Sequence, residues 1–218
     1  MKTNKKGIIL LSGGLDSFVS LDMAKKNCEV ELALFFNYGQ KAYEDEKEAV
    51  EKIASYYKIP AKLIELPFLK ELSKNALTDN NNNNFNDLES VWIPNRNGLF
   101  LNIAACFCDK HNYDYIILGA NKEESIEFSD NSVEFIKLST QFFGLSTQKH
   151  PIVLAPLKNY DKIETINYVI DNNLPINFIK SCYKADKEKK HCGDCKSCKL
   201  LYNAILKSKK PELIKEIF

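Results

Sequence analysis

Residues 7–17 read GIILLSGGLDS, and this stretch decides the fold class. Gly7 to Leu11 is a short, continuous apolar run that ends at a Ser-Gly-Gly turn, which is typical of a buried strand. Directly after the turn, Leu15, Val19 and Met23 recur at the four-residue spacing of one helix face. A buried strand, a glycine turn and a helix therefore follow one another without a gap.

The same alternation continues along the chain. Strand patterns cover residues 30–37, 61–66 and 115–120, and helical patterns cover residues 15–26, 43–57, 99–109 and 161–173. Continuous apolar strands that alternate with helices predict a parallel sheet with helices on both faces. The predicted fold is therefore α/β and Rossmann-like, and its ligands should bind beyond the carboxyl ends of the strands.

Length and charge narrow the class of protein. A chain of 218 residues fits one domain with a small appendage, and we expect a single α/β domain over residues 1–218. Its 30 basic and 29 acidic residues give a net charge of +1, which removes the electrostatic argument for a membrane or non-specific nucleic-acid partner. No apolar run approaches the roughly 20 residues that span a bilayer and no export signal is visible, so we expect a cytoplasmic protein.

The turn after the first strand has the composition of a phosphate-binding loop. Two glycines let the backbone approach a ligand closely, while amides at the helix N-terminus and two serine hydroxyls can face an anion. The spacing is neither that of a Walker loop nor GxGxxG. An ordinary turn that caps a helix is the alternative. The predicted nucleotide-binding residues are Ser12, Gly13, Gly14, Leu15, Asp16 and Ser17.

Four of the seven cysteines crowd into seventeen residues near the C-terminus, as C-x9-C-x2-C-x2-C. Four thiolates at these spacings can surround Zn²⁺, so we expect a structural zinc that holds a helical segment at about 175–218. A CxxC redox pair, an iron–sulfur cluster, and His191 in place of one cysteine are the alternatives. The predicted ligands are Cys182, Cys192, Cys195 and Cys198.

A zinc ribbon that binds nucleic acid is the rival function for this segment. Residues 180–199 carry seven lysines and three acidic residues, a modest excess that four thiolates and one Zn²⁺ reduce further. Tyr183 is the only aromatic residue there, whereas a nucleic-acid surface usually interleaves several. We therefore expect no direct nucleic-acid partner.

Two further features are unusual in composition. Arg96 is the only arginine, which favours a role for its planar, bidentate guanidinium, although chance in a lysine-rich chain is the alternative. Because it follows Pro94, we expect Arg96 in an exposed loop. Residues 75–86 include an asparagine tract at Asn80–Asn84 without periodicity, which predicts a mobile loop, either a functionless insertion or a lid.

Four motifs together resemble one family. They are SGGLDS at 12–17, NYGQK at 37–41, WIPNRNGLFLNIAA at 92–105, and SCY followed by HCGDCKSC within 181–198. SGGLDS resembles the loop of the PP-loop ATP pyrophosphatases, and the set looks like the 7-cyano-7-deazaguanine synthases of queuosine biosynthesis over nearly the whole chain. The resemblance implies an adenine nucleotide alpha hydrolase-like fold. It also implies conversion of 7-carboxy-7-deazaguanine, ATP and ammonia to the nitrile preQ0 through an acyl-adenylate and an amide.

The resemblance also implies residue roles. The loop would hold the departing pyrophosphate, Asp16 would help place Mg²⁺ or cap the helix, and Arg96 would clamp a carboxylate or phosphate, with Lys41 as a second cation. We treat Asp16, Arg96 and Lys41 as candidate catalytic residues. The candidate substrate-binding residues are Asn95, Asn97, Gly119, Asn121, Glu124 and Asp130. A homodimer is a further expectation.

The chain departs from the family pattern in the substrate pocket. The family usually has a histidine after the basic residue at position 41 and an acid three residues later, where this chain has Ala42 and Asp45. A family Tyr-Pro-Asp-Cys stretch is Phe-Ser-Asp-Asn at 128–131, which keeps Asp130 but replaces Phe128, Ser129 and Asn131. A paralogue that amidates a related carboxylated heterocycle is therefore the alternative. A tRNA thiolase is disfavoured because no sulfur-transfer pair lies near the loop.

Overall fold

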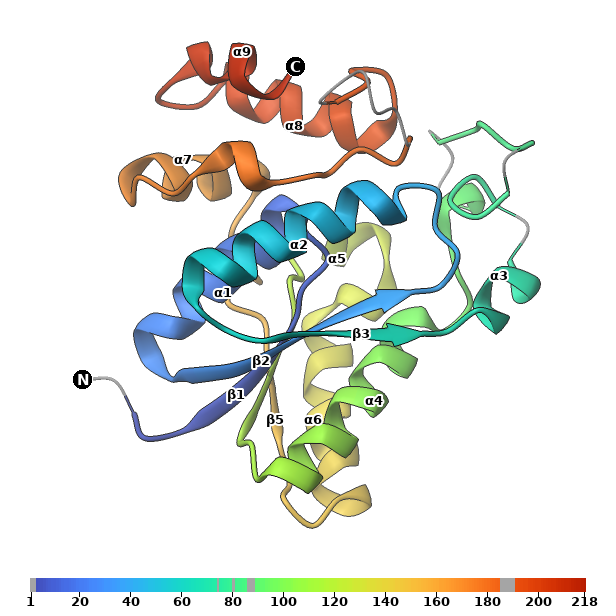
Figure 1. Cartoon of the computed structure of the whole chain (residues 1–218), viewed down its shortest axis with the longest axis vertical. Coiled ribbons are helices and arrows are strands. Elements are labelled where there is room, and N and C mark those ends of the chain that lie inside the picture. The colour runs from blue at the N-terminus through green and yellow to red at the C-terminus, as the bar shows by residue number, and fades with distance from the viewer. Residues whose placement is uncertain (1–2, 74, 80, 86–88, 185–190) are drawn as a thin grey trace.

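The computed structural model describes residues 3–73, 75–79, 81–85, 89–184 and 191–218. Five parallel strands form one sheet in the order β3-β2-β1-β4-β5, with β1 at its centre (Figure 1). The strands are β1 (Lys6–Leu10), β2 (Glu29–Asn37), β3 (Ala61–Glu65), β4 (Tyr115–Ile117) and β5 (Ile152–Leu154). Their parallel order confirms the predicted α/β class.

Helices cover both faces of the sheet, as predicted (Figure 1). One face packs against α1 (Leu15–Asn27), α2 (Tyr43–Tyr57) and α7 (Lys162–Asp171), and the other packs against α4 (Arg96–His111) and α6 (Val133–Ser146). Neighbouring side chains of β1 point to opposite faces of the sheet. Ile9 belongs to the same core cluster as Phe18 of α1, and Ile8 to the same cluster as Leu101 of α4. Both isoleucines are fully buried, which explains why β1 reads as a continuous apolar run.

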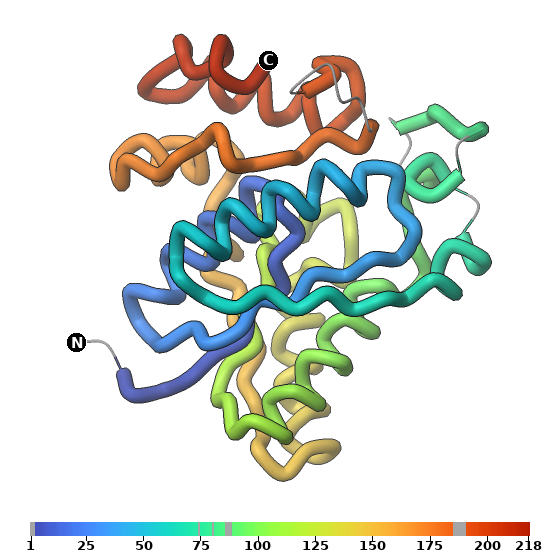
Figure 2. Tube along the Cα trace, viewed as in Figure 1, coloured from blue at the N-terminus to red at the C-terminus, as the bar shows by residue number. Residues whose placement is uncertain are grey.

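Shorter elements complete the chain. They are α3 (Phe68–Leu72), α5 (Glu124–Glu127), α8 (Lys196–Leu206), α9 (Ile214–Ile217), and 3₁₀ turns at Glu89–Val91, Ser129–Asn131, Ile176–Phe178 and Pro211–Leu213. The C-terminal helices α8 and α9 lie over α7, on the same face of the sheet as α1 and α2 (Figure 2). Among the described helices, none is long and apolar enough to span a membrane.

The sequence pattern does not predict the edge strand β5 or the long helix α6. β5 is only three residues long, and it lies at the sheet edge with Ile152 exposed, so it lacks a buried apolar run. Helix α6 packs on the sheet through Ile136 and Phe143 but leaves Leu138, Phe142 and Leu145 exposed. Because apolar residues lie on its exposed side as well, the helical period of α6 is blurred.

The asparagine tract is predicted to be a mobile loop, and its described residues contact the core. Within residues 75–79 and 81–85, the side chain of Asn75 donates to the carbonyl oxygen of Trp92 at 2.7 Å, and Phe85 is 1% exposed. The Lys41 Nζ donates to the carbonyl oxygen of Asn82 at 2.7 Å. Buried side chains thus tie this segment to the core. Asn80 of the tract lies outside the described residues.

Candidate active site and metal site

The Ser-Gly-Gly loop lies where the sequence predicts it, between the end of β1 at Leu10 and the start of α1 at Leu15. Gly13 has φ +80°, and a Cβ there would lie 2.8 Å from both the Glu46 carbonyl oxygen and the Ala49 Cβ, so only glycine fits. The hydroxyls of Ser12 and Ser17 lie 3.2 Å apart and close the loop. The loop therefore presents the N-terminus of α1 to a cavity at the carboxyl ends of the strands.

The end of β4 packs directly against this loop. A Cβ at Gly119 would lie 2.9 Å from the backbone nitrogen of Ser17, so the two backbones need a glycine to come this close. Both residues line one large cavity, which also receives side chains from α2, α4, α5, α7 and the segment before the cysteines. This cavity is the candidate active site.

A buried ion pair lies beside the loop. Lys162 Nζ is 2.6 Å from Asp16 Oδ2 and 3.9 Å from Glu124 Oε1. Burial lowers the pKa of Lys162, but the charges of Asp16 and Glu124 outweigh it and hold that pKa above its usual value. The sequence does not indicate a role for Lys162, because it is one of many lysines and lies 146 residues from Asp16.

The segment just before the cysteines covers the loop. The Lys180 amide donates to the Gly13 carbonyl oxygen at 2.8 Å, and the Leu15 amide donates to Ser181 Oγ at 3.3 Å. Lys180 Nζ lies 3.4 Å from Asp45 Oδ2. Residues adjacent to Cys182 therefore pack against the Ser-Gly-Gly loop, which no local sequence signal indicates.

Arg96 lies on the cavity wall, and its predicted place in an exposed loop is wrong. It is the first residue of α4 and is half-buried. Asn95 adopts a left-handed conformation (φ 52°) that turns the chain into this helix. Arg96 Nη1 donates to the hydroxyl of Tyr38 at 3.4 Å, and its charge also interacts with Asp130. Arg96 therefore lines the cavity from α4, which covers the other face of the sheet from α1.

The predicted substrate residues divide into two groups. Asn97, Gly119, Glu124 and Asp130 line the cavity. Asn121 is fully buried, and its Oδ1 accepts from the Glu124 amide at 2.8 Å, so it positions α5. Asn95 is exposed at the start of α4. Neither Asn95 nor Asn121 is among the cavity-lining residues.

Lys41 does not reach the cavity lining either. Its ammonium group binds the asparagine tract and lies 5.0 Å from the centre of the Phe85 ring. Burial lowers the pKa of Lys41. The cations that do line the cavity are Arg96, Lys162, Lys180 and Lys196.

The four cysteines meet as predicted. Their sulfur atoms all lie within 4.8 Å of one another, and Cys182, Cys195 and Cys198 are buried. Hydrogen bonds among these thiols lower the pKa of Cys195 and raise the pKa of Cys198, so the sulfur atoms interact directly with one another. The cluster can hold a metal ion.

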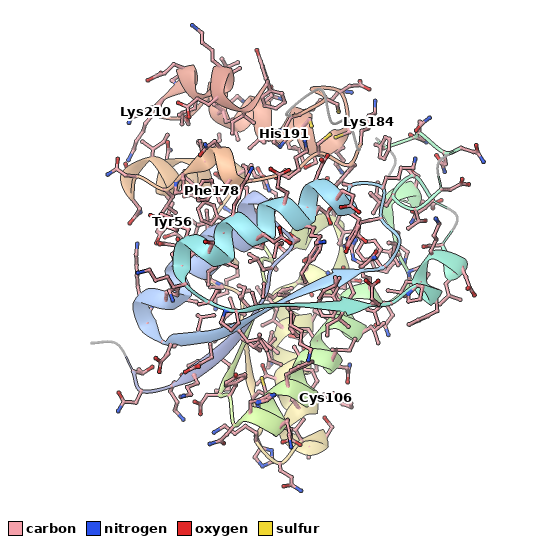
Figure 3. The ribbon with its side chains drawn as sticks, in the orientation of Figure 1. Tyr56, Cys106, Phe178, Lys184, His191 and Lys210 are labelled. Atoms are coloured by element: carbon pink, nitrogen blue, oxygen red, sulfur yellow. The ribbon has the colours of Figure 1, made fainter. Side chains whose placement is uncertain are left out.

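His191 lies beside this cluster but does not take part in it. Its Nε2 accepts from the Ser181 amide at 3.1 Å, so its Nδ1 is the donor to the Ile217 carbonyl oxygen at 3.2 Å. Both ring nitrogens are therefore occupied, and the ring links the cysteine segment to α9. Figure 3 shows His191 close to the C-terminal helices. The alternative in which His191 replaces a cysteine ligand is not supported.

Comparison with known proteins assigns the chain to a family. The model of the family described as Queuosine biosynthesis protein QueC matches residues 6–209. The chain belongs to this family. A 7-cyano-7-deazaguanine synthase of Carboxydothermus hydrogenoformans is 43% identical over 212 residues, covering 92% of this chain and 98% of that protein. A synthase of the same name from Bdellovibrio bacteriovorus is 38% identical over 213 residues, covering 91% of both chains.

A solved structure agrees on the fold. NMN synthetase from Francisella tularensis superposes with a TM-score of 0.51 at 15% sequence identity, covering 98% of this chain and 82% of that chain. At this identity the likeness concerns the fold alone.

Some of the positions expected to depart from the family pattern line the cavity, namely Ala42, Phe128 and Asn131. Ser129 and Asp45 are not among the lining residues, and Asp45 pairs with Lys180. The expected differences therefore include residues of the cavity, whereas the SGGLDS motif is present at 12–17.

Proposed function

We propose that this protein converts 7-carboxy-7-deazaguanine and ammonia to 7-cyano-7-deazaguanine at the expense of ATP. The carboxylate attacks the α-phosphorus of ATP and releases pyrophosphate, ammonia then displaces AMP to give the amide, and a second ATP activates the amide oxygen for loss as AMP. The single observation that carries this proposal is a QueC-family chain whose SGGLDS loop opens into a cavity with Arg96 on its wall.

The residues around the loop fit a departing pyrophosphate. The helix N-terminus behind Gly14 and the hydroxyls of Ser12 and Ser17 form the anion-binding surface. Lys162 and Lys180 add positive charge on two sides of it. If the pyrophosphate group of ATP binds here, the α-phosphate faces the cavity. Negative charge develops at the α-phosphate during the attack.

Two carboxylates fit a Mg²⁺ ion. Asp16 Oδ1 is buried and has no hydrogen-bond partner among the described residues, and Glu124 lies beside the same Lys162. Carboxylate oxygens together with phosphate oxygens are the usual ligands of Mg²⁺. Asp16 and Glu124 would hold this ion, which would neutralise the phosphates of ATP.

The four cysteines fit Zn²⁺ in a structural role. Four sulfur ligands fill a tetrahedral site and leave no position for water. Cys182 directly follows Ser181, so the metal would hold Lys180 and Ser181 against the nucleotide loop. The metal thereby supports the active site without taking part in the reaction.

Two aromatic side chains of the cavity suit a planar heterocycle. The rings of Trp92 and Phe128 are nearly parallel, 6.1 Å apart at an interplanar angle of 11°, and both line the cavity. Asp130 also lines the cavity and can accept hydrogen bonds from the N–H groups of a guanine-like edge. Asn97 donates to the Asp130 carbonyl oxygen at 3.4 Å. A paralogue that stops at the amide of a related acid is the alternative, favoured by the changes at Ala42 and Phe128.

One incubation separates the two candidates. Purified protein with ATP, ammonium and 7-carboxy-7-deazaguanine should yield a product whose mass matches replacement of the carboxyl group by a nitrile. Accumulation of the amide alone would support the paralogue. The homodimer and the cytoplasmic location stay predictions, as does the single domain over residues 1–218.

Replacing Arg96 by lysine should reduce turnover about a hundredfold. Lysine keeps the positive charge but loses the planar fork, so one oxygen of the reacting group lacks its donor in the transition state. Loss of one such donor typically costs roughly 3 kcal/mol. Steady-state turnover and thermal melting check this prediction: activity within a few-fold of the unmodified protein would show that Arg96 is not the clamp.

A further inference from the structure

Glu46 is a cavity-lining carboxyl that neither the motifs nor the proposed roles include. It lies on the first two turns of α2, four residues after Ala42, and both residues line the cavity. Its carbonyl oxygen is the atom that a Cβ at Gly13 would meet at 2.8 Å, so this turn of α2 packs against the nucleotide loop. The Glu46 carboxyl also interacts electrostatically with Arg96. Glu46 therefore belongs to the wall between the loop and Arg96, where the reacting atoms would meet.

One oxygen of this carboxyl is held in place by a fixed amide. Gln40 Nε2 donates to Glu46 Oε2 at 2.9 Å and to the Phe36 carbonyl oxygen at 2.9 Å, while Gln40 Oε1 accepts from the Tyr38 amide at 2.9 Å. Gln40 is 5% exposed, so the backbone bonds lock its orientation. Within the described part of the chain, Glu46 Oε1 has no hydrogen-bond partner. The carboxyl is therefore oriented through Oε2 and has Oε1 available to a ligand.

The surroundings of Glu46 suit a proton acceptor at neutral pH. Burial raises its pKa to about 7, although the Gln40 hydrogen bond and the charge of Arg96 lower it, and Asp45 adds to the rise. Tyr38, the other titratable neighbour, is neutral because burial raises its pKa to about 12. The lysines of the lining are paired with other carboxylates: Lys162 with Asp16, Lys180 with Asp45, and Lys196 with Glu127.

We propose that Glu46 is the general base of amide formation, taking a proton from the nitrogen of the attacking ammonia. This inference rests on the proposed function. As the nitrogen bonds to the acyl carbon, the carbonyl electrons move to oxygen and one N–H proton passes to Glu46 Oε1. The carbonyl then re-forms, the bond from carbon to the phosphate oxygen breaks, and AMP leaves with that electron pair.

The other carboxylates of the cavity suit this role less well. Burial raises the pKa of Glu124 as well, although the charge of Lys162, 3.9 Å away, lowers it, but Glu124 is placed to hold Mg²⁺. Asp130 also interacts with the charge of Arg96, but its carboxyl is the group proposed to bind the heterocycle. The described lining contains no histidine, and Ala42 stands where the family pattern has one, so a carboxyl with a raised pKa is the available base.

Glu46→Gln tests the proposal in a single turnover that separates the two half-reactions. Pyrophosphate release that depends on the carboxylate substrate should stay within about threefold of the unmodified protein. The summed formation of amide and nitrile should fall at least about a hundredfold, the usual contribution of a general base. Equal loss of both half-reactions, or an unchanged amide rate, would overturn the proposal. Glu48→Gln is the matched control, because Glu48 lies on the same helix in an exposed pair with Lys52 and should change neither rate.

The pH dependence of the unmodified protein gives a second test that needs no variant. At a fixed concentration of unprotonated ammonia, the amide rate should rise tenfold per pH unit below about pH 7 and level off above it, because the ionised carboxylate is the active form. A flat profile would overturn the proposal even if Glu46→Gln does not fold. If the proposed function itself fails, the unmodified protein will release no pyrophosphate in response to the carboxylate substrate.

Discussion

Replacing Cys195 by serine should abolish stoichiometric metal binding and most of the activity together. Cys195 is fully buried at the start of α8, where its sulfur meets the other three. Metal affinity in such a site is also folding free energy, on the order of 10 kcal/mol in small zinc-binding domains. Loss of the ion should therefore release the segment that brings Lys180 and Ser181 to the nucleotide loop.

Metal analysis, thermal melting and turnover of the purified variant check this prediction. Cys106→Ser is the matched control, because Cys106 is an exposed cysteine of α4 on the opposite face of the sheet (Figure 3). It should keep its metal, its melting temperature and its activity. A Cys195→Ser protein that lacks metal but turns over normally would show that the loop does not depend on the cysteine site.

Lys162→Met should destabilise the protein by about 3–5 kcal/mol, the usual cost of leaving one partner of a buried ion pair uncompensated. The Lys162 and Asp16 side chains are only 13% and 16% exposed, and Glu124 adds a second negative charge nearby. Denaturant unfolding without nucleotide or divalent cation measures this effect. Turnover should also fall, because Lys162 faces the proposed pyrophosphate position.

A double variant separates charge from packing in this prediction. Adding Asp16→Asn to Lys162→Met removes the unpaired charge, so much of the lost stability should return while activity stays low. Lys158→Met, which removes an exposed lysine four residues away, should leave stability and turnover unchanged. If Lys162→Met is as stable as the unmodified protein, the pair does not contribute to folding as described.

The parts of the structure that sequence predicts well are those specified by local pattern. The GIILL run, the two glycines and the spacing of Leu15 and Val19 all lie within one strand-turn-helix unit, and the structure reproduces it. The cysteine spacing likewise predicts the cluster because three of its members lie within seven residues. β5 is not predicted because it has only three residues at the sheet edge, of which Val153 alone is buried, and this is too short to show a period.

The side chains that complete the candidate site are harder to predict because long-range topology selects them. Lys162 reaches Asp16, and Ser181 reaches Leu15, across more than 140 residues each. Nothing in the sequence distinguishes Lys162 from the other lysines, or Glu46 from its acidic neighbours on α2. The rarity of arginine singles out Arg96 as a candidate site residue. Its half-buried position at the start of α4 is not predicted, because the left-handed turn at Asn95 has no clear signal after Pro94.

The most direct test of the acyl-adenylate follows the oxygen atoms of the substrate. 7-Carboxy-7-deazaguanine with both carboxyl oxygens labelled as ¹⁸O is incubated with the protein, ATP and ammonium, and the phosphorus products are analysed by mass spectrometry. The proposed reaction predicts AMP with one ¹⁸O atom and unlabelled pyrophosphate, because the carboxyl oxygen bonds to the α-phosphorus. ADP with ¹⁸O in inorganic phosphate would contradict it, since the γ-phosphorus would then have been attacked.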